Sequence, residues 1–167
     1  LSSHKRGWDV RWKEFSDVAD QAEELKKQLI RMVDEDTRAF NRIMDAFGLA
    51  NGSPEEKAAR KAAIQEATRY AIEVPYKVMQ LSASTLTIIH QMADQGNPNS
   101  VSDAGVGALC ARTAVMGAWL NVKINCAGYE DKAFVDQTLN TCESIVQGVN
   151  QKEASILQLV HQKIANG

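Results

Sequence analysis

Little in this sequence would interrupt a helix, and several common functional motifs are missing. Only three prolines occur in 167 residues. No stretch alternates apolar and polar residues as a half-buried strand would, and no apolar run is long enough to span a bilayer. Metal spacings such as HExxH, CxxC pairs, nucleotide-binding glycine loops and GxSxG elbows are also missing. These absences disfavour the enzyme classes that depend on such motifs, and we expect no metal site.

The sequence also lacks a large excess of charge of either sign. The net charge is −2, so bulk electrostatics give no reason to expect a nucleic-acid or membrane partner. Cys110, Cys126 and Cys142 are an odd set without a close pair, and no secretory signal precedes them. Free thiols in a reducing compartment are the simplest interpretation, which predicts a cytoplasmic protein.

Most of the sequence has the periodicity of amphipathic helices. Apolar residues recur every three or four positions over about 10–47, 53–92, 102–125 and 130–164. Four long helices joined by short connections predict an all-α bundle that occupies one domain, residues 1–167.

The second of these ranges contains one signal for the start of a helix and one for an interruption within it. Ser53, Pro54 and Glu56 form a capping box with proline in its favoured first position. Pro75 lies inside the same helix, lacks an N–H and crowds the carbonyl of Ala71. We therefore expect a kink or a break near Pro75.

The third helix is apolar nearly all round, with only Arg112 and Lys123 charged after Asp103. We expect near-total burial of this helix, either by a missing neighbouring helix or by a second subunit, and predict a homodimer. The chain opens with Leu1 rather than methionine. We interpret it as a fragment that lacks an N-terminal helix.

Asp36 is the strongest anomaly, because it falls on the apolar stripe of the first helix between Met32 and Phe40. A carboxylate that is costly to bury must be paired or used. Burial would favour its protonated form and suit it to proton transfer near neutral pH. The alternative, equally weighted by the pattern, is a structural carboxylate bonded to a neighbouring helix.

A face of small residues on the third helix is the second anomaly. Asp103, Asn121 and Asn125 share this face, and the small residues between them are Gly107, Cys110, Ala111, Ala114, Gly117 and Ala118. Such a face either admits a flat ligand, whose amide edge the Asn side chains would bind, or lets another helix pack closely. The pattern alone favours close packing.

Three stretches resemble a known family. They are VDEDTRAFNRIMDAFGL at 33–49, PEEKAARKAAIQEATRYAIEVPYKVM at 54–79 and GNPNSVSDAGVGALCARTAVMGAWLNVKIN at 96–125. All three resemble the formiminotetrahydrofolate cyclodeaminase family, whose relatives include methenyltetrahydrofolate cyclohydrolases. The opening LSSHKRGW is similar to the point just after that family's first helix.

The resemblance implies a dimeric, all-helical enzyme with a folate cleft between helices. It implies an ammonia-lyase of histidine degradation and one-carbon metabolism, which converts 5-formiminotetrahydrofolate to 5,10-methenyltetrahydrofolate. The tetrahydrofolate derivative, with or without a polyglutamate tail, would be the substrate, and no prosthetic group is implied. A formiminotransferase domain would be fused to the chain or associated with it.

The resemblance also implies site residues. Asp36 and Asn41 match the family's DxxAFN motif, Ser102 and Asp103 match its SD pair, and Asn121 and Asn125 match its NxxIN run. Asp36 is the predicted catalytic acid–base, and the other five are predicted to bind the substrate.

Two departures from the family bear on activity. The glycine-rich PGGGS-type segment is missing, and Leu49-Ala50-Asn51 stands where the family commonly has Leu-Pro-Lys. Three functions therefore stay open at this point. They are cyclodeaminase, cyclohydrolase in the same cleft with water as nucleophile, and a non-catalytic helical module for folate binding or assembly.

Overall fold

The computed structural model of the protein describes residue 2 and residues 6–166. Four long helices make up the described chain: α1 Trp12–Gly48, α2 Pro54–Gln95, α3 Val101–Cys126 and α4 Lys132–Asn166. Two short 3₁₀ turns, η1 Asp9–Arg11 and η2 Pro98–Ser100, precede α1 and α3. No strand occurs in residues 2 and 6–166, so the predicted all-α bundle of four helices is confirmed.

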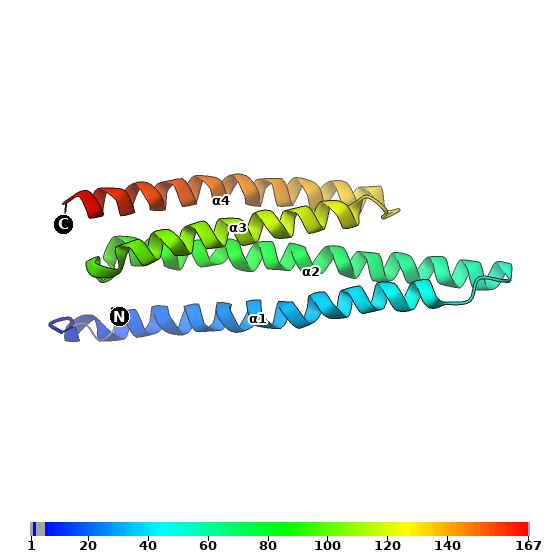
Figure 1. Ribbon diagram of the computed structural model, residues 1–167, viewed down its shortest axis with the longest axis horizontal. Helices are drawn as coiled ribbons and strands as arrows, with labels where there is room; N and C mark the ends of the chain where they lie inside the picture. The colour runs from blue at the N-terminus through cyan, green and yellow to red at the C-terminus, as the bar shows by residue number, and fades with distance from the viewer. Residues whose placement is uncertain (1, 3–5, 167) are drawn as a thin grey trace.

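The helices run back and forth along one long axis. The α1–α2 and α3–α4 turns lie at one end, and the α2–α3 turn lies at the other end with both chain termini (Figure 1). α2 packs against the three other helices, α3 and α4 also pack against each other, and α1 packs chiefly on α2. α1 is therefore an outer helix added to a three-helix unit. No described helix combines the length and the apolar character that a membrane crossing would need.

The start of α2 is fixed by the predicted capping box. The Ser53 hydroxyl accepts a hydrogen bond from the Glu56 backbone N–H at 3.2 Å, and the Glu56 carboxylate accepts one from the Ser53 N–H at 2.9 Å. Two backbone donors at the helix end are thereby satisfied.

Pro75 leaves α2 continuous, without the break that was one of the two expected outcomes. Proline has no N–H to donate to the carbonyl four residues earlier, which is that of Ala71. The Asn125 side-chain amide of α3 donates to this carbonyl instead, at 2.7 Å. A neighbouring helix therefore supplies the hydrogen bond that the proline removes, and the helix continues.

The main core lies between α2, α3 and α4. Its fully buried side chains include Ile72, Met79, Leu86, Val115 and Ile156. A second, much smaller cluster joins α1 to α2 and consists of Ala39, Ala71 and Val74. Most of the buried apolar surface thus belongs to the three-helix unit.

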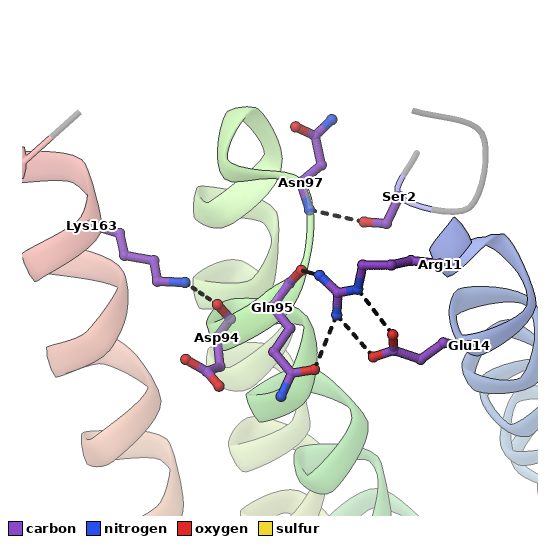
Figure 2. Close-up of polar contacts among 7 residues, drawn as sticks. All are labelled: Ser2, Arg11, Glu14, Asp94, Gln95, Asn97 and Lys163. Atoms are coloured by element: carbon purple, nitrogen blue, oxygen red, sulfur yellow. Dashed lines mark hydrogen bonds and ion pairs between the residues drawn. The ribbon is translucent and has the colours of Figure 1, made fainter. Parts of the chain in front are cut away.

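The end of the bundle that holds the termini is tied by polar contacts (Figure 2). The Arg11 guanidinium pairs with Glu14 at 2.9 Å and donates to the backbone and side-chain oxygens of Gln95 at 3.4 and 3.3 Å. Lys163 of α4 donates to the Asp94 carbonyl. The η1 turn that leads into α1 and the last turn of α4 are therefore both attached to the end of α2.

The single chain leaves one face of α3 open. Val106, Leu120 and Ile124 are 58%, 61% and 72% exposed. Among the described helices, α2 and α4 are the ones that pack extensively on α3. The covering of the open face by a second subunit or by a further helix therefore stays a prediction.

Candidate functional site

α1 has a charged side and an apolar side. On the charged side, Arg42 and Asp45 line a groove of about 380 Å³ with Glu66 of α2. On the other side, large apolar residues are half or more exposed: Val33 68%, Phe40 63%, Met44 53% and Phe47 51%. The residues that face α2, such as Ala39 and Ala46, lie between these two sides.

The apolar side of α1 and the uncovered face of α3 lie on the same flank of the molecule. Two adjoining hollows share Ile88 and Met92 of α2; Ala22 of α1 lines one and Asp103 of α3 lines the other. Eighteen residues make about five full helical turns, so Phe40 points to the same side as Ala22. By the same rule Asn121 points to the same side as Asp103. We call the exposed residues of α1 and α3 on this side the apolar flank.

Asp36 borders the apolar flank, and its predicted burial is wrong. Its side chain is exposed, and it has no ion pair or hydrogen bond with the part of the chain that the structure describes. The apolar stripe on which it falls is present, but none of the described helices covers that part of α1. The described residues therefore offer no buried partner for Asp36, and an accessible carboxylate lies beside exposed apolar side chains.

The neighbouring carboxylate, Glu35, behaves differently. The Tyr70 hydroxyl of α2 donates to Glu35, and Arg38 forms an ion pair with it. The Tyr70 hydrogen bond lowers the pKa of Glu35 and also raises the pKa of Tyr70. The Arg42 guanidinium lies 4.2 Å from the centre of the Tyr70 ring. This network, which the sequence pattern did not reveal, attaches α1 to α2 one residue away from Asp36.

Two of the predicted site residues lie near one level along the bundle. Tyr70 contacts Glu35 of α1, and the adjacent Ala71 accepts the hydrogen bond from Asn125 of α3. Asp36 and Asn125 therefore lie at nearly the same height, on the two helices that flank α2, and Asn121 lies one helical turn, about 6 Å, before Asn125 on α3. The amide of Asn125 is engaged by α2, which fits the packing role that the sequence left open. Asn121 is exposed.

The remaining predicted residues lie elsewhere. Ser102 and Asp103 are exposed near the other end of the flank, and Asn41 is exposed on α1. Asp103 and Asn121 are 18 residues apart on one helix, which corresponds to about 27 Å. Groups that act on the same reacting atoms must each lie within hydrogen-bond distance of them. The single chain therefore does not bring all six residues to one site.

The small-residue face of α3 divides into two halves. Gly107 faces Ile89 of α2, where an added methyl group would lie 3.6 Å from the isoleucine side chain. Cys110, Ala114 and Gly117 are instead exposed. Half of the face serves helix packing, as the pattern favoured, and the other half is open on the apolar flank.

The three cysteines are free thiols, as predicted. Burial raises the pKa of Cys126, and it raises the pKa of Cys142 to about 11. These two thiols are therefore protonated at neutral pH and unsuited to nucleophilic attack. Cys110 is exposed on the open face of α3.

Residues 1–144 match the family model described as formiminotransferase-cyclodeaminase. The chain belongs to this family. A methenyltetrahydrofolate cyclohydrolase from Methylorubrum extorquens is 34% identical over 151 residues, which are 90% of this chain and 73% of the relative. A formimidoyltransferase-cyclodeaminase from Mus musculus is 34% identical over 130 residues, which are 78% of this chain and 24% of the relative.

A solved structure shows the same fold. The crystal structure of formiminotetrahydrofolate cyclodeaminase from Thermotoga maritima matches with a TM-score of 0.73 and 23% identity, over 93% of this chain and 75% of that one. The predicted family is thus confirmed, and the relatives are folate-metabolising enzymes. Their names give two different reactions, and the site residues carried over from the motif remain predictions.

Proposed function

We propose that the chain is a cyclodeaminase, which releases ammonia from 5-formiminotetrahydrofolate to give 5,10-methenyltetrahydrofolate. The observation that carries this proposal is the position of Asp36. It is an accessible carboxylate in the stretch that matches the family, beside exposed apolar side chains and within about one helical turn of the level of Asn121. Such a surface offers stacking area for a flat heterocycle and a proton acceptor at its edge.

The chemistry requires one proton carrier. N10 of the folate attacks the carbon of the protonated formimino group on N5, and the new C–N bond gives a tetrahedral intermediate that carries an NH2 group. Asp36 accepts the N10 proton and passes it to this NH2 group, so that the C–N bond to it breaks, ammonia leaves and the cationic methenyl bridge forms. Both reacting groups belong to one substrate molecule, so positioning supplies much of the rate. The apolar side of α1 would hold the rings, and Asn121 would bind their polar edge.

Neither the bond that forms nor the bond that breaks involves a redox change, so the proposed reaction needs no prosthetic group besides the folate substrate. We propose that the enzyme acts as a cytoplasmic homodimer in histidine degradation. The murine relative's name combines a transferase with a cyclodeaminase, and this chain matches 24% of its length. A fused or associated formiminotransferase would supply the formimino substrate.

A polyglutamate tail has a candidate contact at the α1–α2 turn. Asn51 replaces the lysine common in the family, but it lines a hollow of about 200 Å³ together with Lys57, Arg60 and Lys61 of α2. Lys61 is paired with Glu130 at 3.0 Å. Lys57 and Arg60 would then meet the tail carboxylates in place of the missing lysine.

Cyclohydrolase is the second candidate, and one observation favours it. The Methylorubrum relative with that name matches 90% of this chain. The same flank would then bind 5,10-methenyltetrahydrofolate, and Asp36 would take a proton from water as it attacks the methenyl carbon.

Two assays on the purified protein separate the candidates. In the first, 5-formiminotetrahydrofolate is supplied, and ammonia release is measured together with the absorbance of the methenyl product. In the second, 5,10-methenyltetrahydrofolate is supplied, and the loss of that absorbance is compared with the rate without enzyme. We expect ammonia release in the first assay. Methenyl hydrolysis without ammonia release would make the protein a cyclohydrolase, and folate binding without either reaction would make it a binding module.

A further inference from the structure

Tyr70 of α2 contacts α1 at two points. Its hydroxyl donates to the Glu35 carboxylate, and the Arg42 guanidinium lies 4.2 Å from the centre of its ring. Glu35 and Arg42 are seven residues apart, which is close to two full turns, so both lie on the same side of α1. The Tyr70 side chain is partly buried and packs against the small apolar cluster between the two helices. One side chain of α2 therefore contacts one side of α1 over about 10 Å.

The apolar contact between α1 and α2 at this level is made largely of small side chains. Its buried cluster consists of Ala39, Ala71 and Val74. Alanine side chains let two helices approach closely but form low ridges, so they resist rotation of one helix against the other only weakly. A hydrogen bond depends on direction as well as distance, and the bond from Tyr70 can therefore fix the rotation of α1.

Among the described residues, the Tyr70 bond is the one nearest to Asp36 of the side-chain hydrogen bonds that hold α1 and η1 on α2. The bond to the Phe47 carbonyl lies 12 residues, or about 18 Å, further along α1 from Glu35. The bond from Arg11 lies 24 residues, or about 36 Å, in the other direction. The position of α1 at Asp36 therefore depends chiefly on Tyr70.

Glu35 and Asp36 lie on opposite sides of the line along which α1 contacts α2. Ala39 marks this line, because it is buried in the cluster between the two helices. At about 100° per residue, Glu35 lies about 40° to one side of Ala39 and Asp36 about 60° to the other. A side chain extends about 6 Å from the helix axis, so a rotation of α1 by about 10° would move the Asp36 carboxylate by about 1 Å. A displacement of that size can lower the rate of a reaction by about 100-fold.

We propose that Tyr70 is a positioning residue, whose contacts with α1 hold the Asp36 carboxylate in line with the reacting atoms of the folate. Tyr70 acts through α1 and does not touch the substrate. The next residue of α2, Ala71, accepts the hydrogen bond from Asn125, so two consecutive residues of α2 fix α1 and α3 near the level of Asp36. The inference rests on the proposed function and adds the residue that orients its acid–base group.

Turnover of variants, measured with the folate on which the wild type is active, tests this role. Tyr70→Phe removes only the hydroxyl and should lower kcat about tenfold. KM should change by less than about twofold, because the exposed apolar side chains that would hold the rings are untouched. Glu35→Ala should lower kcat about as much, and the double variant Tyr70→Phe/Glu35→Ala no further, since both changes remove the same bond. Glu35→Gln should keep most of the turnover, because the carboxamide oxygen still accepts the hydroxyl's hydrogen bond.

Two control variants separate positioning from stability. Arg11→Met removes the contact with Gln95 at the far end of the helix and should lower the thermal midpoint, as Tyr70→Phe does, while kcat stays unchanged. Arg38→Gln removes the other partner of Glu35, which lies on α1 itself, and should also keep kcat. All assays are run well below the thermal midpoints, and circular dichroism verifies the helicity of each variant.

Three results would each overturn the role of Tyr70: wild-type kcat in Tyr70→Phe, an equal loss in Glu35→Gln and Glu35→Ala, or an equal loss in Arg11→Met and Tyr70→Phe. With an active wild type, these results would leave the proposed function in place. A wild type that turns over neither folate would remove the proposed function and the positioning role together.

Discussion

The two parts of this bundle are held together by different forces. The α2–α3–α4 unit surrounds a continuous core that includes Ile72, Leu86 and Ile156. α1 adds only a small apolar cluster to α2 and depends on polar contacts: Arg11 with Gln95, Tyr70 with Glu35, and Arg60 with the Phe47 carbonyl. The difference shows how a long helix can be fixed in place while its apolar side stays available for a ligand or a second copy.

The largest expected effect tests whether the exposed side of α1 carries the activity, and it is expected at Asp36. Asp36→Asn should lower cyclodeaminase turnover by about two to four powers of ten, the range for losing a general acid–base. The thermal midpoint should hardly move, because the Asp36 side chain is exposed and has no bonded partner among the described residues. Asp34→Asn, at another exposed position of α1, is the matched control and should keep its turnover. A lowered midpoint with normal turnover would show instead that Asp36 is structural.

Two side-chain truncations compare how much the three-helix core and the outer helix α1 contribute to the free energy of unfolding. Leu86→Ala removes a side chain with no exposure in the three-helix core and should cost about 2–5 kcal/mol in the free energy of unfolding. Leu25→Ala, on the partly buried side of α1, should cost less than half as much because solvent already reaches the side chain. Urea unfolding of both variants gives the two values. Equal losses would contradict the division of the molecule into a three-helix unit and an outer helix.

The Asn125 amide stabilises the three-helix unit through a polar contact, because it bonds α3 to the proline turn of α2. Asn125→Ala leaves the Ala71 carbonyl without its donor and should cost about 1–3 kcal/mol. In a Pro75→Ala background the helix supplies its own N–H to that carbonyl, so the same substitution should cost clearly less. Urea unfolding of the four proteins in this cycle measures the coupling. An undiminished cost in the alanine background would refute the compensation.

The smallest expected effect is pH-dependent and concerns Tyr70. The pKa of Glu35 lies below its ordinary 4.5, so its bond with Tyr70 adds stability above that pH and loses it as the pH falls through the lowered value. The pKa of Tyr70 lies above 10.0, so the same bond weakens again in strong alkali. Tyr70→Phe should therefore lower the thermal midpoint by on the order of 1–3 °C at neutral pH, and by less in acid. A difference that grows on acidification would be inconsistent with this assignment.

The helices themselves were predictable because each one carries its own periodicity and end signals. The capping box at Ser53 formed as expected, and the four ranges differ from the observed helices by only a few residues. A stripe on one helix does not reveal what covers it, however. For this reason the pattern placed Asp36 correctly on an apolar stripe but could not show that the stripe is uncovered.

The pairing between helices was the part that the sequence could not supply. Whether Pro75 would break α2 depended on a donor 50 residues later in the chain, Asn125. The Glu35–Tyr70 bond likewise joins residues 35 positions apart. The height difference between Asp103 and Asn121 follows from their spacing on one helix, but which of them shares a level with Asp36 depends on the register of α1, α2 and α3.

The hydrogen bond between Asn125 and Ala71 also helps to fix the register of α3 against α2. Helix faces rich in alanine and glycine are smooth, so two such helices could slide past each other by a turn at modest cost in packing. In α2 the proline leaves one particular carbonyl, that of Ala71, without a helical donor, and the Asn125 amide donates to it. A slip of one turn would take the amide away from this carbonyl and leave the carbonyl without its donor. The proline and the asparagine together therefore favour one alignment of the two helices, and a polar residue at one position can set helix alignment in this way.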